Sequence, residues 1–389
     1  MRLSRISLAA VSLKLQPNRS NFTRFRVLRT TIPIWSEARH TWRYCDALSG
    51  PARRLPHAIP KERREGLRMN SITSPNIRNL LLLTTYSIVF AFVLLLGTGC
   101  GALRRAEIRS LAGIFSDPPG SNVFVEDNDP ELIRKALPFA LKTYEALLAS
   151  DPKNPGLYLT TADGFVKYAS AFVHMDAERL EKRDFRRAQS LLQRAKKLYL
   201  RGRNYALSGL TLDYPNFEKK LREDRQQVLQ ALSHKDVPLL FWAAAGWAGA
   251  ISTNVNDMSL LAELPIVEAM MGRALELNED FESGAIHEFF ITYEGSRSET
   301  MGGSAERARE HFTRAVQLTR GEKASPYVSL AFSVAVRKQD HQMFKGLLQE
   351  ALAIDPDAVP KWRLANILAQ EKAQWLLGRS AELFVDYEE

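Results

Sequence analysis

Histidine and glutamate stand side by side at His287 and Glu288, which is how the zinc-protease motif His-Glu-x-x-His begins. That motif needs a second histidine one helical turn later, so that two imidazoles lie on one helix face. The sequence has Ile291 at that position, which excludes this metal site. Glycine-rich phosphate loops, serine nucleophile elbows and paired Cys/His motifs are also missing from the sequence. We therefore predict a protein that is not an enzyme and uses no metal and no cofactor.

The same stretch carries aromatic and acidic side chains at helical spacing. The simpler interpretation of His287 is a partly buried helical residue that makes one hydrogen bond. The functional interpretation places it on a helix that faces a ligand or a partner protein. The residues of that candidate face are His287, Glu288, Phe289, Phe290, Tyr293 and Glu294.

A second candidate region is the segment DVPLLFWAAAGWAGAIS at 236–252, where Trp242 and Trp247 stand among alanines and glycines. Small residues let another helix or a ligand come very close. The segment is apolar nearly all round, so we expect it to be buried in the core or at an interface. A central core helix is the simpler interpretation, and an apolar channel or an oligomer face is the functional one.

Cys100 is a candidate lipidation site. The uncharged apolar run LLLLTTYSIVFAFVLLL at 80–96 follows Arg78 and ends just before the small residues Gly97, Thr98 and Gly99. A signal h-region, small residues and then cysteine resemble a bacterial lipoprotein signal, although Gly97 takes the place where leucine is usual. A plain transmembrane anchor with a chance cysteine is the alternative. The other cysteine, Cys45, also precedes the predicted domain, so we expect no disulfide framework there.

The net charge of +9 comes from the N-terminal leader rather than from the predicted domain. Residues 1–68 hold an excess of 11 Lys and Arg, whereas residues 100–389 have a net charge of −3. We therefore predict no nucleic-acid binding. A start at Met69 would give a conventional signal over 69–99, with 1–68 outside the mature protein and 100–122 as a tether. An organelle transit peptide is the rival interpretation of residues 1–68.

Apolar residues at a spacing of three or four predict an all-α domain over 123–389. Asp129-Pro130, Asn154-Pro155 and Ser325-Pro326 each combine a capping residue with proline, which is typical of a helix start. The first predicted apolar stripe consists of Leu132, Ala136, Leu137, Ala140, Leu141, Tyr144, Leu147 and Leu148.

A recurring pattern of small, bulky and alanine positions resembles the second helix of a tetratricopeptide (TPR) unit. Its copies are Ala140–Tyr144–Leu147, Val267–Met271–Ala274, Ala308–Phe312–Ala315 and Phe344–Leu348–Ala351. The last two alanines are 36 residues apart, close to the ~34 of a TPR. We predict a TPR-like α-solenoid over 260–377. The middle section does not keep this period, and helices over 156–180, 184–210 and 237–252 fit an ordinary bundle core equally well.

Three stretches of the sequence resemble the TRAP-transporter T-component (TatT) family in their order and spacing. They begin at VFVEDNDPELIRKALPFA (123–140), DVPLLFWAAAGWAGAIS (236–252) and LPIVEAMMGRALEL (264–277), and the segments HEFF, TYEGSR and MGGSAERAREHF carry most of the likeness. The likeness spans 123–377. The lipoprotein signal agrees with that family, and the basic leader does not.

The resemblance implies a periplasmic, lipid-anchored TPR-like protein that pairs with the solute-binding protein of a tripartite ATP-independent periplasmic (TRAP) transporter. It also implies a homo-oligomer, with a trimer expected, around an apolar passage, and a small organic solute that the protein helps bind or pass. Gly101 after the cysteine mildly favours the outer membrane, because aspartate there would favour inner-membrane retention. The alternative function is a TPR scaffold lipoprotein in envelope or outer-membrane assembly.

Overall fold

A computed structural model describes residues 123–385. Every regular element in this range is helical, and no strand occurs among these residues, which confirms the all-α prediction. Cys100 and the predicted leader, signal and tether (1–68, 69–99 and 100–122) lie outside the described residues.

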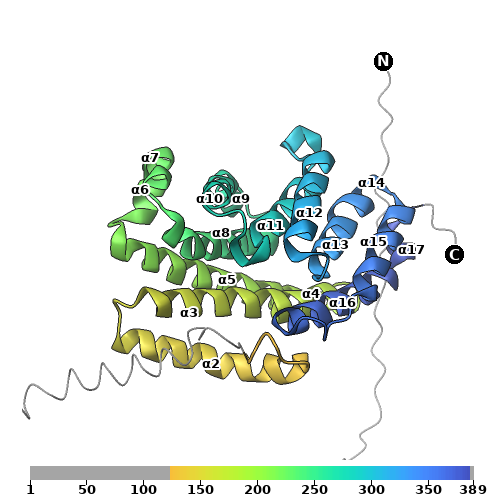
Figure 1. Ribbon diagram of the computed structural model, residues 1–389, viewed down its shortest axis with the longest axis horizontal. Helices are drawn as coiled ribbons and strands as arrows, with labels where there is room; N and C mark the ends of the chain where they lie inside the picture. Colours follow the sequence, from red (N-terminus) through yellow and green to blue (C-terminus); the bar gives the residue numbers. More distant parts are fainter. Residues whose placement is uncertain (1–122, 386–389) are drawn as a thin grey trace, which may run out of the picture. The chain divides into compact units, whose positions relative to one another are not determined.

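Figure 1 shows the helices in chain order. The first part contains α2 (Pro130–Ser150), α3 (Pro155–Tyr168), η1 (Ala169–His174), α4 (Met175–Leu180), α5 (Phe185–Asp213), α6 (Phe217–Glu223), α7 (Arg225–Gln230), η2 (His234–Asp236), α8 (Val237–Ser252), α9 (Met258–Leu261) and α10 (Leu264–Leu277). The second part contains η3 (Phe281–Ser283), α11 (Ala285–Ser296), η4 (Glu299–Met301), α12 (Ala305–Thr319), α13 (Ser325–Leu330), η5 (Ala331–Ala335), α14 (Val336–Lys338), α15 (His341–Ala353), η6 (Pro360–Trp362), α16 (Arg363–Leu377) and α17 (Ser380–Leu383).

Two of the three predicted cap–proline starts are confirmed. The Asp129 side chain accepts hydrogen bonds from the backbone N–H groups of Glu131 and Leu132, and Asn154 caps α3 in the same way. The third start was wrong in detail, because α13 begins at Ser325 itself and the Ser325 hydroxyl donates to Glu288 on α11. A contact with another helix has therefore replaced the local cap.

The apolar stripe of α2 is shifted by one residue at its start. Leu132 is 53% exposed, whereas the neighbouring Ile133 is buried together with Leu141 and Tyr144. Adjacent helical positions differ by about 100° around the axis, so only one of the two can face α3. The prediction that Leu132 belongs to the core was wrong.

The helix α8 is the central core helix that the sequence favours. It packs on α5, α3 and α10, and ten of its residues are buried, among them Trp242 and Trp247. A Cβ atom at Gly246 would lie 2.9 Å from the backbone oxygen of Tyr199 on α5. Glycine at this position therefore lets the backbones of α5 and α8 approach each other more closely than a larger residue would allow.

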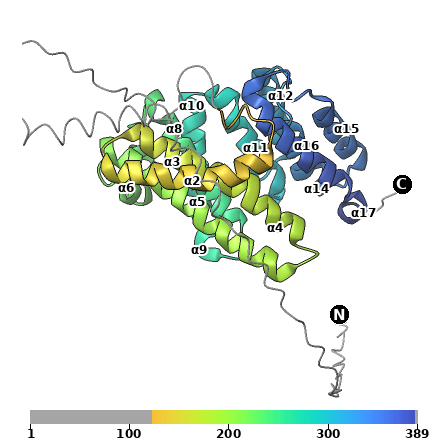
Figure 2. The same ribbon diagram turned by 90° about the horizontal axis from the view of Figure 1, so that it is seen from below.

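Two helical runs contain a π-helical segment. The run predicted at 156–180 is continuous from α3 through η1 to α4, and η5 interrupts the run from α13 to α14 in the same manner. The predicted helices at 184–210 and 237–252 correspond to α5 and α8. Figure 2 shows α3, α4 and α5 as a long antiparallel layer against which α2 lies.

The pattern positions of the predicted repeats face the interior. Val267, Met271 and Ala274 on α10 are fully buried, and so are Phe344, Leu348 and Ala351 on α15. The TPR-like period itself stays a prediction. Because residues 123–385 form continuous apolar cores of their own, we expect residues 123–389 to fold without the preceding chain.

Candidate functional site

The helix α11 carries six of the eight candidate binding residues, and α8 carries Trp242 and Trp247. Most of them are buried: Trp247 is fully buried, and Trp242, Phe290 and Tyr293 are each less than a tenth exposed. They do not form one cluster. Trp247 contacts residues of α5, α6 and the start of α10, and Trp242 contacts α3, whereas the α11 residues contact α12 and the start of α13.

The indole N–H of Trp247 has a hydrogen-bond acceptor inside the fold. Its indole Nε1 donates to Glu263 Oε2 at 2.7 Å, and the guanidinium groups of Arg203 and Arg222 lie 4.6 and 5.3 Å from its ring centroid. Both arginines stand over an aromatic ring, the geometry in which a cation gains from the ring quadrupole. Trp247 therefore acts as a bridge between α5, α6 and the start of α10.

Trp242 lies at the other end of the same helix. Its ring meets Phe241 edge-on at 4.9 Å, and the Lys167 ammonium from α3 is 4.8 Å from its centroid. Phe241 in turn contacts Phe281 at 5.1 Å. This aromatic chain connects α8 with the segment that leads into α11.

Two histidines meet between α11 and α12. The Nδ1 atoms of His287 and His311 are 2.9 Å apart, which requires that one imidazole donates a proton and the other accepts it. The ring of Phe290 stacks on His311 at 4.9 Å. Burial lowers the pKa of His287, and burial together with the neighbouring His287 lowers the pKa of His311 to about 4. Both rings are therefore neutral near pH 7.

The outer side of His287 faces a charged pair. Its Nε2 atom is buried without a hydrogen bond and lies 3.6 Å from Glu279 Oε2. Glu279 is held by Arg314, which donates to both carboxylate oxygens at 2.5 and 3.3 Å. The Arg314 guanidinium is the first cause that lowers the pKa of Glu279, so this carboxylate stays ionised beside the imidazole.

Glu288 serves a different contact. Its two carboxylate oxygens accept from the Lys323 ammonium at 2.5 Å and from the Ser325 hydroxyl at 2.6 Å. Both side chains of the ion pair are mostly buried, and Lys323 also lies 4.9 Å from the Trp362 ring centroid. Glu288 therefore joins α11 to the start of α13 and to η6.

Three aromatic rings follow one another along α11. Phe289 meets Phe290 edge-on and stacks on Tyr293 at 5.4 Å, and the Arg297 guanidinium covers Tyr293 at 3.6 Å from its centroid. Burial and the Glu268 carboxylate raise the pKa of Tyr293, so its hydroxyl is protonated at neutral pH. The stack ends at an arginine that begins the turn toward α12.

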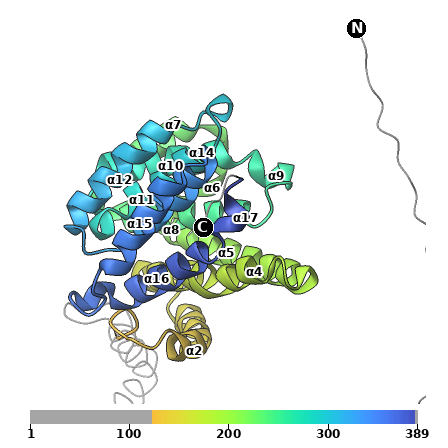
Figure 3. The same cartoon turned by 90° about the vertical axis from the view of Figure 1, so that its right-hand side faces the viewer.

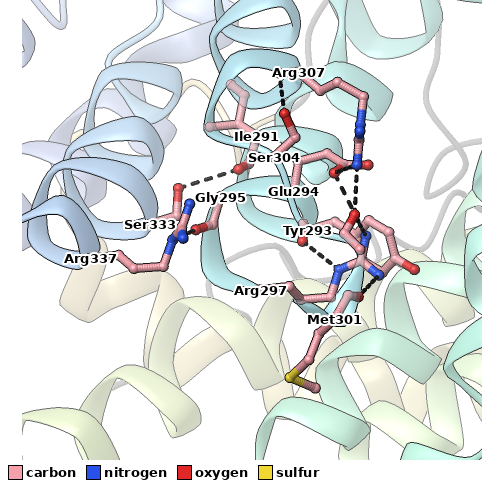
Figure 4. A network of polar contacts seen from close by, with 11 residues as sticks. Ile291, Tyr293, Glu294, Gly295, Arg297, Met301, Ser304, Arg307, Ser333 and Arg337 are labelled. Atoms are coloured by element: carbon pink, nitrogen blue, oxygen red, sulfur yellow. Dashed lines mark hydrogen bonds and ion pairs between the residues drawn. The ribbon is translucent and has the colours of Figure 1, made fainter. Parts of the chain in front are cut away.

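Glu294, near the end of α11, holds that turn through hydrogen bonds. Its carboxylate accepts from Arg307 at 2.6 Å, and its backbone oxygen accepts from the Ser304 N–H at 3.0 Å (Figure 4). Arg307 also donates to the Gly302 oxygen at 2.6 Å, and Arg297 donates to the Met301 oxygen at 3.2 Å. Glu294 is 6% exposed, and Arg307 and Arg297 are its ion-pair partners at 2.6 and 3.7 Å. The result is a fixed turn over 297–304 whose outermost apolar side chain, Met301, is 60% exposed.

On its opposite face, α11 contacts η5 through a glycine, Gly295. A Cβ at Gly295 would collide with Ser333, and the Arg337 Nε donates to the Gly295 oxygen at 2.7 Å. Ser333 donates to the backbone of Ile291 (Figure 4). Glycine is therefore needed here to seat α11 against η5.

Sequence reasoning missed five residues that complete these contacts. They are Arg297, Arg307, His311, Lys323 and Ser325. Three of them, Arg297, Arg307 and His311, lie within the TYEGSR and MGGSAERAREHF segments that carry the family likeness, which was the available signal. Their pairing with α11 depends on how the chain turns between 297 and 304, and spacing alone does not reveal it.

The polar side chains of α11 are used in contacts between helices. Within residues 123–385, no group of three or more His, Cys, Asp and Glu side chains is placed to hold a metal ion. The helices described in that range include none that is long and apolar enough to cross a membrane. The acids and histidines of α11 are occupied with partners from other helices, which makes α11 a rigid support.

Two comparisons place the chain among known sequences. A family model described as TRAP transporter T-component matches residues 126–384. An uncharacterized protein of Treponema pallidum (strain Nichols) is 31% identical over 314 residues, a stretch that covers 76% of this chain and 97% of that protein. The match covers the helices from α2 to α17.

Proposed function

Because the chain belongs to the TRAP transporter T-component family, we propose that it is an accessory protein that binds the solute-binding protein of a TRAP system in the periplasm. The observation that carries this proposal is the match over 126–384, which includes α11, α12 and the contacts between them. The side chains of that cluster are held in place by buried pairs, as a protein-binding surface requires. A small organic solute would then pass between the two proteins.

The contact surface in this proposal is the turn at 297–304. Met301 presents a flexible thioether to solvent, and such side chains adapt well to a partner. The turn is held by Glu294, Arg297 and Arg307, so little conformational freedom is lost when a partner binds. In this account the predicted residues Tyr293 and Glu294 support the surface, and Met301 touches the partner.

Capture from host periplasm tests the proposal. The domain spanning residues 123–389 is immobilised, and retained proteins are identified by mass spectrometry. We expect a TRAP-type solute-binding protein, and Met301→Asp should weaken its binding about tenfold, because a charge would enter an apolar contact. Leu132→Asp is the matched control, since Leu132 is similarly exposed on α2.

The outcome separates the two functions considered from the sequence. Equal capture by wild type and Met301→Asp would remove the proposed contact surface. Recovery of envelope-assembly factors without any solute-binding protein would favour the scaffold function instead.

The lipid anchor at Cys100 and the homo-oligomer belong to the same proposal. Mass spectrometry of the mature protein should find diacylglycerol on Cys100, and Cys100→Ala should release the protein from the membrane fraction. Analytical ultracentrifugation of residues 123–389 should give a sedimenting species larger than one chain, with a trimer expected. A monomer at all concentrations would contradict the oligomer.

A further inference from the structure

Three exposed apolar side chains lie at two turns on one side of the domain, one where α4 meets α5 and one where the chain enters α9. Phe185 at the start of α5 is 62% exposed, and Val255 and Met258, at the turn into α9, are 65% and 71% exposed. The α4–α5 connection and α9 project on the same side of the helices in Figures 2 and 3. We call these two turns and the residues around them the α5 rim.

The α5 rim is also basic. Residues 181–187, at the α4–α5 connection, are all exposed, and they include Lys182, Arg183, Arg186 and Arg187. Lys182 is paired with Glu382, but within residues 123–385 no ion pair involves the other three. Of the two acids in this stretch, Asp184 caps α5 by accepting from the Arg187 backbone N–H. Residues 181–187 carry four cations against Glu181 and Asp184, a net charge of +2, in a domain whose overall charge is negative.

The second turn of the rim is fastened to α5 at Lys196, about three helical turns after Phe185. Asp257, next to Met258, accepts from the Lys196 ammonium of α5 at 2.7 Å and from the Ser259 hydroxyl at 2.6 Å. Its backbone bonds to Asn254 complete the turn. Val255 and Met258 are thus presented to solvent in a fixed position relative to α5, rather than being free to fold back onto it.

We propose that the α5 rim rests on the surface of an anionic phospholipid bilayer. Arginine cations are attracted to lipid phosphates, and an aromatic ring with two aliphatic side chains can enter the boundary between headgroups and acyl chains. An exposed phenylalanine among arginines, with two further exposed apolar side chains on the same side of the domain, matches that interface in charge and in polarity. A few such contacts bind weakly alone, but they would orient a domain that the proposed lipid anchor at Cys100 keeps at the membrane, so this inference rests on that part of the proposed function.

Vesicle binding of residues 123–389, which contain neither Cys100 nor the apolar run, tests the rim directly. The protein should co-sediment with phosphatidylcholine vesicles that contain phosphatidylglycerol and should remain in solution with phosphatidylcholine alone. High salt should weaken the binding, because it screens the arginines. Replacing Arg183, Arg186 and Arg187 by glutamate should lower the partition coefficient by at least about tenfold. Phe185→Ser should lower it less and without a change in salt dependence.

The matched control reverses three exposed lysines elsewhere for which no ion pair occurs within residues 123–385, as Lys153→Glu, Lys220→Glu and Lys345→Glu, with the same change of net charge. It should bind vesicles about as well as wild type. Circular dichroism of each variant checks that it is folded. An equal loss in the control, or equal binding to neutral vesicles, would overturn the proposal.

Failure of this inference and failure of the proposed function are distinguishable. Capture of the solute-binding protein is measured without lipid, so it can succeed while vesicle binding fails. If wild type does not bind anionic vesicles and the arginine variant no longer captures the solute-binding protein, the α5 rim is a protein contact and the membrane proposal is wrong.

Discussion

His287 and His311 share one proton across the α11–α12 interface, with their Nδ1 atoms 2.9 Å apart. The pair can form only while at most one of the rings is charged, because two imidazolium ions at this distance would repel each other and would have no acceptor between them. Phe290 covers His311 on one side, and Glu279 with Arg314 lies beside His287. The stability of this interface therefore depends on pH.

Acidification should destabilise the domain through this pair. The folded pKa of His311 is about 4, below its ordinary value of 6.5, so the unfolded chain binds more protons between these values. Stability is fully present above about pH 6.5 and is lost as the pH falls toward 4. After a discount for the partial exposure of His311, we expect a loss of about 2 kcal/mol in the free energy of unfolding. Urea unfolding followed by circular dichroism at a series of pH values measures it.

The control separates this pair from the other titrating groups. His311→Gln keeps a hydrogen-bonding side chain but cannot gain charge, so it should flatten the stability profile between pH 6.5 and 4. His234→Gln, at an exposed position, should leave the profile as in wild type. Profiles that are the same for all three proteins would show that the imidazole pair does not set the acid sensitivity.

Two helical glycines, Gly246 at the contact between α5 and α8 and Gly272 on α10, should respond in opposite ways to substitution by alanine. Gly246→Ala puts a Cβ 2.9 Å from the Tyr199 backbone oxygen, which must move, and should destabilise the domain by about 1–3 kcal/mol. Gly272→Ala, in the middle of α10, meets no atom within 4 Å and should stabilise by about 0.5–1 kcal/mol. Thermal unfolding of the two variants beside wild type tests both signs. A stabilising Gly246→Ala would mean that the two helices are not in close contact.

Local signals in the sequence were enough to place most helices. Asp129 and Asn154 predict their helices correctly because a cap, a proline and the following turn lie within a few residues. The small residues of 236–252 likewise predict close packing, as Gly246 shows. Where the signal was local but the partner was distant, as at Ser325, the prediction was wrong.

The contacts of the candidate site depend on how helices are placed next to one another. His311 and Arg307 reach α11 only because the chain reverses at 297–304 and brings α12 back beside it. No sequence period encodes which residue of α12 then faces His287 or Glu294. The choice between Leu132 and Ile133 had the same origin, since both fit a helical stripe and only the position of α3 decides between them.

Ion pairs connect α4 to α16, which are far apart in the sequence. A charge reversal in such a pair should lower stability, and reversing the partner as well should restore it. Lys372 on α16 donates to Glu178 at 3.2 Å, beside the pair Arg179–Glu371. Lys372→Glu should cost about 1 kcal/mol, because it places two carboxylates side by side. The combined exchange Glu178→Lys and Lys372→Glu should restore most of the loss in a double-mutant cycle measured by urea unfolding. If the exchange recovers nothing, α4 and α16 do not interact through this pair.

The pair Glu294–Arg307 predicts an asymmetric response to the loss of either partner. Arg307→Ala leaves a carboxylate that is 6% exposed and whose remaining ion pair, among residues 123–385, is with Arg297 at 3.7 Å; it should destabilise the domain by about 3 kcal/mol. Glu294→Gln removes the charge but keeps a group that can accept from Arg307, so it should cost about 1 kcal/mol. In the double variant the loss should be smaller than the sum, because the stranded charge is gone. Urea unfolding of the four proteins measures the cycle, and additive losses would show that Glu294 and Arg307 are not energetically coupled. Since the same two residues hold the turn around Met301, Arg307→Ala should also weaken capture of the solute-binding protein, whereas Glu294→Gln should affect it less.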